Sequence, residues 1–272
     1  MKLLPEENLN ITSEQKLPLK MSRHQKVICG IYLLLVASAE VSTIYMPIFG
    51  IAFHVAILFS LLIFSVLAKN PTFADFLLAF AIVPLIRILS LSMPLTHLAY
   101  IMWFLLISIP IFIAIFACMR LQRLSLKDVG MAFPKVKDLP IEAGVVLLAL
   151  PTGILEYHIL MPEPLLYGLE PILLIVSVFI IIICTGFVEE LAFRGLMQYH
   201  AVKMMGWWGI PFITATFAIM HIGNLNYWDV LLAFILGGVY ALVARKTGSI
   251  YGVTLSHGLV NTILFLIGPV YL

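Results

Sequence analysis

The chain has 272 residues, of which 62% are hydrophobic and only 11% are charged. An ordinary soluble domain contains roughly 25% charged residues, so this composition excludes a soluble globular protein. It also excludes a disordered chain, and 16 Lys and Arg against 14 Asp and Glu provide no basic surface for a nucleic acid. The composition therefore predicts an all-α, polytopic helical membrane protein.

The first 26 residues, 1–26, are polar and lack the apolar core of a signal peptide, so we expect a cytoplasmic tail. The apolar runs after this tail are candidate spans, because a transmembrane helix needs about 20 apolar residues. Two of them, 209–222 and 229–244, are shorter than that, so the sequence predicts eight or nine transmembrane helices. The runs cover about 27–47, 49–68, 76–93, 97–118, 141–158, 171–188, 209–222, 229–244 and 249–268.

The distribution of Lys and Arg predicts the orientation, because short basic segments stay in the cytoplasm. The tail and the segment 119–140 each contain five such residues, and four runs lie between them. We therefore expect the N-terminus inside and the C-terminus outside a cell membrane. The segment 119–140 mixes leucines with basic residues, which favours a short interfacial helix. It separates a four-helix transmembrane part, 27–118, from a C-terminal transmembrane part, 141–272.

Ionisable residues inside spans are the most informative, because each carboxylate or Arg at a helix centre costs roughly 2.5–3.5 kcal/mol. Glu40 and Arg87 lie in different spans, and we expect them to pair. Most of the others belong to the last third of the chain. The full set is Glu40, His54, Arg87, Glu189, Glu190, Arg194, His221 and His257.

The stretch TGFVEELAFRG places two carboxylates and an arginine at the end of the run 171–188. Glu190 and Arg194 are four residues apart, so we expect them to pair on one helix face. Glu189 points in another direction, and Phe193 is its neighbour four residues on. We therefore expect Glu189 to be a poorly hydrated carboxylate suited to general base catalysis. The alternative is a solvated helix end.

Two further pairs have the same spacing, Phe217 with His221 and His257 with Asn261. Polar groups in apolar helices need partners, so each pair alone is explained by hydrogen bonds between helices. Together with Glu189 they predict a polar cavity that activates water and stabilises an oxyanion. No cofactor is required for this chemistry. The alternative is zinc bound by two His and a Glu, although the HExxH spacing is absent.

The stretches EELAFR, FAIMH and HGLVN, in this order, resemble the signature of the CPBP family, also called the ABI family. Its members are CAAX-protease and bacteriocin-processing intramembrane glutamic endopeptidases. The resemblance covers about 180–265. It implies metal-independent hydrolysis of a peptide bond in a membrane-associated peptide or lipidated protein, at a cavity that opens to the cytoplasm.

The resemblance also assigns roles to single residues. Glu189 would activate the attacking water, His221 would hold that water, and His257 and Asn261 would stabilise the oxyanion. The supporting residues would be Glu190, Arg194 and Phe217.

Two other functions remain open on the sequence. A non-catalytic scaffold or immunity protein of the same fold would bind a membrane partner. A channel or transporter would use the polar cluster for its substrate, but no inverted repeat of the kind common in transporters is present.

Overall fold

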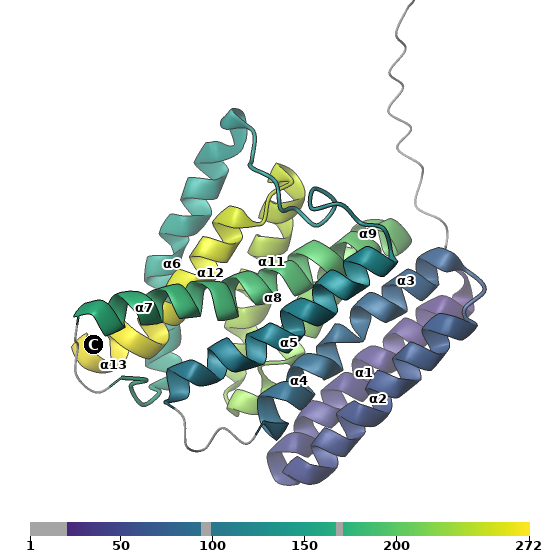
Figure 1. Cartoon of the computed structure of the whole chain (residues 1–272), viewed down its shortest axis with the longest axis horizontal. Coiled ribbons are helices and arrows are strands. Elements are labelled where there is room, and N and C mark those ends of the chain that lie inside the picture. Colours follow the sequence, from purple (N-terminus) through teal and green to yellow (C-terminus); the bar gives the residue numbers. More distant parts are fainter. Residues whose placement is uncertain (1–20, 94–98, 167–170) are drawn as a thin grey trace, which may run out of the picture.

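The computed structural model describes residues 21–93, 99–166 and 171–272, and most of these residues are helical (Figure 1). Within them, eight helical stretches are long and apolar enough to cross a membrane. The chain is therefore a multi-pass helical membrane protein. Eight is the lower of the two predicted numbers of spans, whereas a C-terminus on the opposite side from the N-terminus requires an odd number.

The N-terminal helices pack next to one another along one side of the molecule (Figure 1). The helix α1 is capped by Ser22, which exchanges hydrogen bonds with Gln25, and the next two helices begin with a proline in the first turn. A bend at Ala81 divides the third span into two helices. The elements are α1 (Arg23–Tyr45), α2 (Pro47–Leu67), α3 (Pro71–Phe80), α4 (Ile82–Ser92) and α5 (Tyr100–Leu121).

The predicted interfacial helix in 119–140 is wrong. After α5 the residues 122–135 form turns, and a single 3-10 turn (Val136–Asp138) leads into α6 (Leu139–Leu160). Gly130 has a φ of 71°, which interrupts any helix at this point. Asp128 accepts hydrogen bonds from the Ser125 amide and hydroxyl, at 2.8 and 2.6 Å, and these bonds lower the pKa of the Asp128 carboxyl.

A long continuous helix runs from Pro171 to Met205. It consists of α7 (Pro171–Ile181), α8 (Val188–Glu190) and α9 (Gln198–Met205), which are joined by π-helical turns at Ile182–Phe187 and Leu191–Met197. Glu189 thus lies at the end of the apolar run 171–188 but not at the end of the helix, which continues well beyond it. π-Helical turns of this kind are frequent at functional sites.

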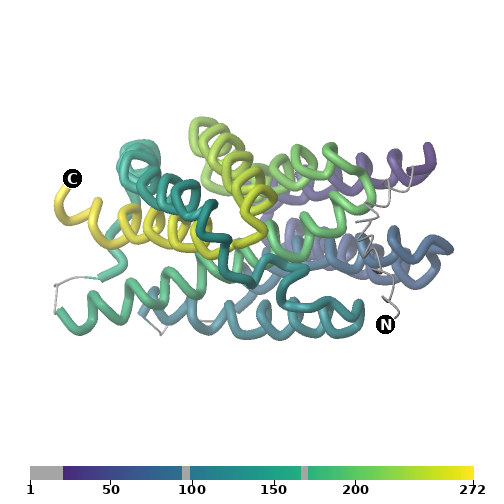
Figure 2. Tube along the Cα trace, turned by 90° about the horizontal axis from the view of Figure 1, so that it is seen from above, coloured from purple at the N-terminus to yellow at the C-terminus, as the bar shows by residue number. Residues whose placement is uncertain are grey.

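The remaining helices complete the C-terminal part. The helix α10 has 11 residues, which corresponds to about 17 Å and is too short for a full span. Seen from above, α12 lies between α6 on one side and α7 on the other (Figure 2). The elements are α10 (Gly209–Ile219), α11 (Tyr227–Thr247), α12 (Tyr251–Thr262) and α13 (Gly268–Tyr271).

Two glycines let α12 approach the long helix closely. A Cβ atom on Gly186 would lie 2.8 Å from the backbone nitrogen of Gly258 and 2.8 Å from the carbonyl oxygen of Thr254. A Cβ atom on Gly258 would lie 2.7 Å from the Cα of Ile182. Any side chain here would push the two backbones apart, so these glycines set the distance between the helix with Glu189 and the helix with His257.

We predict that Gly186→Ala destabilises the protein by about 1–3 kcal/mol or more, because the new methyl group meets backbone that cannot move aside. The measurement is the thermal unfolding midpoint of the detergent-solubilised protein. Gly144→Ala is the matched control, since a Cβ atom on this exposed helical glycine meets nothing within 4 Å. Equal midpoints for the two variants would contradict the prediction.

Candidate active site

Glu190 and Arg194 form a buried ion pair. Arg194 Nη1 donates to Glu190 Oε1 at 2.8 Å, and the two side chains are 1% and 0% exposed. The predicted pairing is therefore confirmed, and the alternative of a solvated helix end is wrong. The guanidinium also donates to the carbonyl oxygen of Gly237 at 3.2 Å and lies 4.2 Å from the centroid of the Phe217 ring. Such contacts compensate for the loss of hydration of a buried cation.

His257 lies between the two neighbouring carboxylates. Its Nδ1 is 2.8 Å from Glu190 Oε1, and its Nε2 is 3.9 Å from Glu189 Oε2. Since a carboxylate that already binds an arginine only accepts hydrogen bonds, Nδ1 carries a proton that it donates to Glu190. Glu190 thus fixes the orientation of the His257 ring in addition to neutralising Arg194. Sequence spacing did not indicate this contact.

The two glutamates differ in burial. The Glu189 side chain is 33% exposed, whereas that of Glu190 is fully buried. Glu189 is therefore the more accessible of the two carboxylates, and its poor hydration stays a prediction.

His221 follows the C-terminal end of α10. Its Nδ1 lies 3.0 Å from the carbonyl oxygen of Phe217. Because a carbonyl oxygen only accepts, Nδ1 carries the proton and the neutral ring leaves a lone pair on Nε2. Within the described residues the histidine ion pairs involve His54 and His257, and His221 makes no direct ion pair with Glu189.

A small cavity of about 30 Å³ brings residues from four helical elements together. Since one water needs roughly 10–15 Å³ of such space, the cavity has room for one or two waters. Asn261 also donates to the Thr185 hydroxyl at 2.9 Å, which ties α12 to the long helix. The cavity is lined by Glu156, Phe217, His221, Leu232, Ala233, Leu236, Tyr240, His257, Val260 and Asn261.

Two acidic residues near this cavity were missed in the sequence. Glu156 of α6 lines the cavity, although it lies inside the apolar run 141–158 and the same criterion would have identified it. Asp229 is 1% exposed at the start of α11 and accepts a hydrogen bond from Asn224 Nδ2 at 2.8 Å. It lies at the edge of its apolar run, where a carboxylate gives no clear signal.

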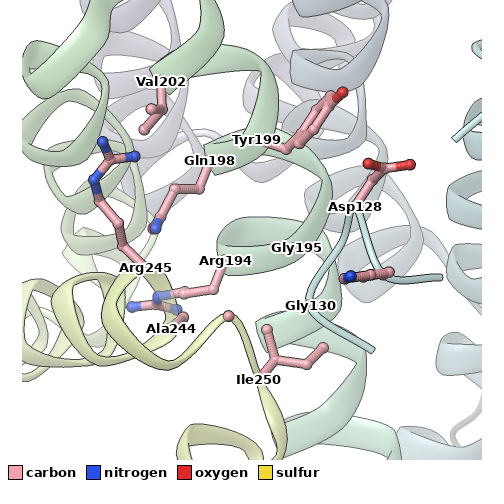
Figure 3. Close-up of a pocket in the computed structure, with 12 residues that line it drawn as sticks. Asp128, Gly130, Arg194, Gly195, Gln198, Tyr199, Val202, Ala244, Arg245 and Ile250 are labelled. Carbon is pink, nitrogen blue, oxygen red and sulfur yellow. The ribbon is translucent and has the colours of Figure 1, made fainter. Parts of the chain in front are cut away.

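A second, larger cavity of about 280 Å³ lies next to the ion pair (Figure 3). Its lining includes Arg194, Arg245 and Asp128, and Arg245 stacks 4.7 Å from the centroid of the Trp207 ring. Arg194 also contacts Phe217, which lines the small cavity. Arg194 therefore lines the larger cavity and contacts a residue that lines the small one.

No group of three or more His, Cys, Asp or Glu side chains in the described part of the chain is arranged to hold a metal ion. The nearest arrangement is that of His257 with Glu189 and Glu190. Arg194 and the His257 ring both donate to the same oxygen of Glu190, Oε1.

Residues 171–263 match the family model of the type II CAAX prenyl endopeptidases, described as Rce1-like. The match covers all three sequence stretches named above and confirms the resemblance to the CPBP family over this region. The match covers about a third of the chain and makes this region similar to that of CAAX-type proteases. No curated protein and no solved structure matches the chain.

We predict that Arg194→Met lowers the free energy of unfolding by about 3–5 kcal/mol, because it leaves the buried Glu190 carboxylate without its counter-ion. The double variant Glu190→Gln/Arg194→Met should recover part of this loss. Thermal unfolding in detergent measures both effects. Arg120→Met is the control, since Arg120 is exposed at the end of α5. A stability of Arg194→Met equal to that of the control would refute the prediction.

Proposed function

We propose that this protein is an intramembrane glutamic endopeptidase that hydrolyses a peptide bond in a membrane-associated peptide or lipidated protein. The observation that carries the proposal is the position of His257. One of its nitrogens is held by Glu190, the other faces the partly exposed Glu189, and the ring lines a water-sized cavity together with His221. The family match over the same residues supports the reaction class.

In the proposed mechanism Glu189 is the general base. It takes a proton from a water that also donates a hydrogen bond to the lone pair on His221 Nε2, and the water attacks the scissile carbonyl carbon. The proton then passes to the leaving amine. Glu189 suits this exchange because its side chain is partly exposed and no arginine neutralises it.

The oxyanion is stabilised by His257 and Asn261. The protonated His257 ring donates from Nδ1 to Glu190 and from Nε2 to the developing oxyanion. Asn261 donates one amide hydrogen to Thr185 and has a second one free for the substrate. Glu190, Arg194 and Phe217 act through His257 and His221, whose rings they orient. No metal takes part in this scheme, and zinc held by the same histidines is the alternative.

We predict that Glu189→Gln lowers kcat by about 10²–10⁴-fold, the usual contribution of a general base. The assay uses the solubilised full-length protein and quenched peptides with and without a C-terminal prenylcysteine. The control is Glu163→Gln, which alters an exposed carboxylate between α6 and α7. Glu156→Gln is measured in parallel, because this second carboxylate lines the cavity and a larger loss there would make it the base instead.

The same assay tests the alternatives. Cleavage that survives a chelator and requires Glu189 supports the proposal, whereas cleavage abolished by the chelator would turn Glu189, His221 and His257 into candidate zinc ligands. Folded wild-type protein that cleaves no peptide of the library would favour a scaffold or immunity protein that binds a membrane partner.

We also propose that the protein lies in the cell membrane with its N-terminus in the cytoplasm and its active-site cavity open to that side. The basic residues of the N-terminal tail and of the segment 119–140, where α5 ends and α6 begins, support this orientation. In a variant without Cys29, Cys118 and Cys184, a cysteine at Lys127 should be protected from an impermeant maleimide in intact cells. A cysteine at Glu163 should react, and the reverse pattern would invert the topology.

A further inference from the structure

A second group of buried charges lies in the N-terminal helices, outside the region that matches the family. Arg87 of α4 donates from Nε to Glu40 Oε1 of α1 at 2.8 Å, so the predicted pairing is confirmed. His54 of α2 lies 3.4 Å from the same oxygen. Glu40 and His54 are both completely buried. Three charged or polar groups on three helices thus meet inside the apolar bundle.

This cluster contacts the end of the helix that precedes His221. Arg87 Nη2 donates to the carbonyl oxygen of Met220, the residue directly before His221. The last carbonyl groups of a helix have no intrahelical donor, and an arginine both satisfies them and interacts favourably with the helix dipole. Arg87 therefore caps the C-terminal end of α10.

The same pair of charges also packs against the turn that follows His221. A Cβ atom on Gly223 would lie 4.0 Å from Arg87 Nη2 and 4.0 Å from Glu40 Oε2. The ion pair therefore lies next to the chain on both sides of His221, with a hydrogen bond at Met220 and close packing at Gly223. None of the three charged residues lines the small cavity itself.

We propose that Arg87, held in place by Glu40, is a positioning residue that fixes His221 relative to the attacking water. This inference rests on the proposed function. The short helix α10 ends at Ile219. Within the described residues the His221 ring hydrogen-bonds to the carbonyl oxygen of Phe217 and packs against the Phe217 ring, so both of these contacts are to α10 and the contact from Arg87 fixes the end of that helix. Displacement of a catalytic group by about 1 Å can cost about 10²-fold in rate.

The test compares Arg87→Met and Glu40→Gln with Glu142→Gln. The control removes another buried carboxylate, which accepts a hydrogen bond from the Gly252 amide at 2.7 Å and has no hydrogen bond to His221. We expect Arg87→Met and Glu40→Gln to lower kcat by about 10–10²-fold with little change in KM, and Arg87→Lys to be intermediate. The control should lose thermal stability while it keeps its kcat.

A second measurement does not depend on activity. In protein labelled with ¹⁵N-histidine, the ring signals of His221, assigned by their loss in His221→Gln, should shift in Arg87→Met and Glu40→Gln but not in Glu142→Gln. Unchanged signals or an unchanged kcat in folded Arg87→Met would overturn the inference. Shifted signals in a protein without peptidase activity would uphold the positioning role and overturn the proposed function. Activity that requires Glu189 but not Arg87 would overturn the positioning role and uphold the proposed function.

Discussion

The buried carboxylate of Glu190 is the interaction on which the rest of the site depends. A fully buried charge in an apolar bundle has to be compensated by well-placed partners. Glu190 Oε1 accepts from Arg194 on its own helix and from His257 on α12, while Arg194 reaches the Gly237 carbonyl of α11. One carboxylate thus fixes the relative positions of three helices and directs His257 Nε2 towards Glu189.

Backbone geometry makes this arrangement possible. The two π-helical turns on either side of α8 extend the helix without a break, so the glutamates lie within one long helix and not at its end. Gly186 and Gly258 remove the side chains that would otherwise separate the long helix from α12. Helix contacts in membranes depend on such close approach, because lipid supplies no hydrophobic driving force between helices.

The N-terminal helices contribute more than additional spans. The family match begins at residue 171, yet Arg87 of α4 binds the end of α10 beside His221. Since Glu40 and Arg87 neutralise each other in the interior, the pair holds α1, α4 and the end of α10 in one arrangement. The part of the chain without a family match therefore helps to shape the part that has one.

The sequence by itself determined the features that depend on local spacing and on the cost of charge in an apolar segment. It predicted eight or nine spans, the Glu190–Arg194 pair and the pairing of Glu40 with Arg87. Tertiary structure alone decided the contact of Glu190 with His257, which are 67 residues apart, and the entry of Glu156 into the cavity. Tertiary structure also decided that the helix continues past residue 188 and that residues 122–135 form no α-helix. Hydropathy indicates which residues leave water, whereas π-helical turns, close glycine contacts and the exposure of Glu189 depend on which helices become neighbours.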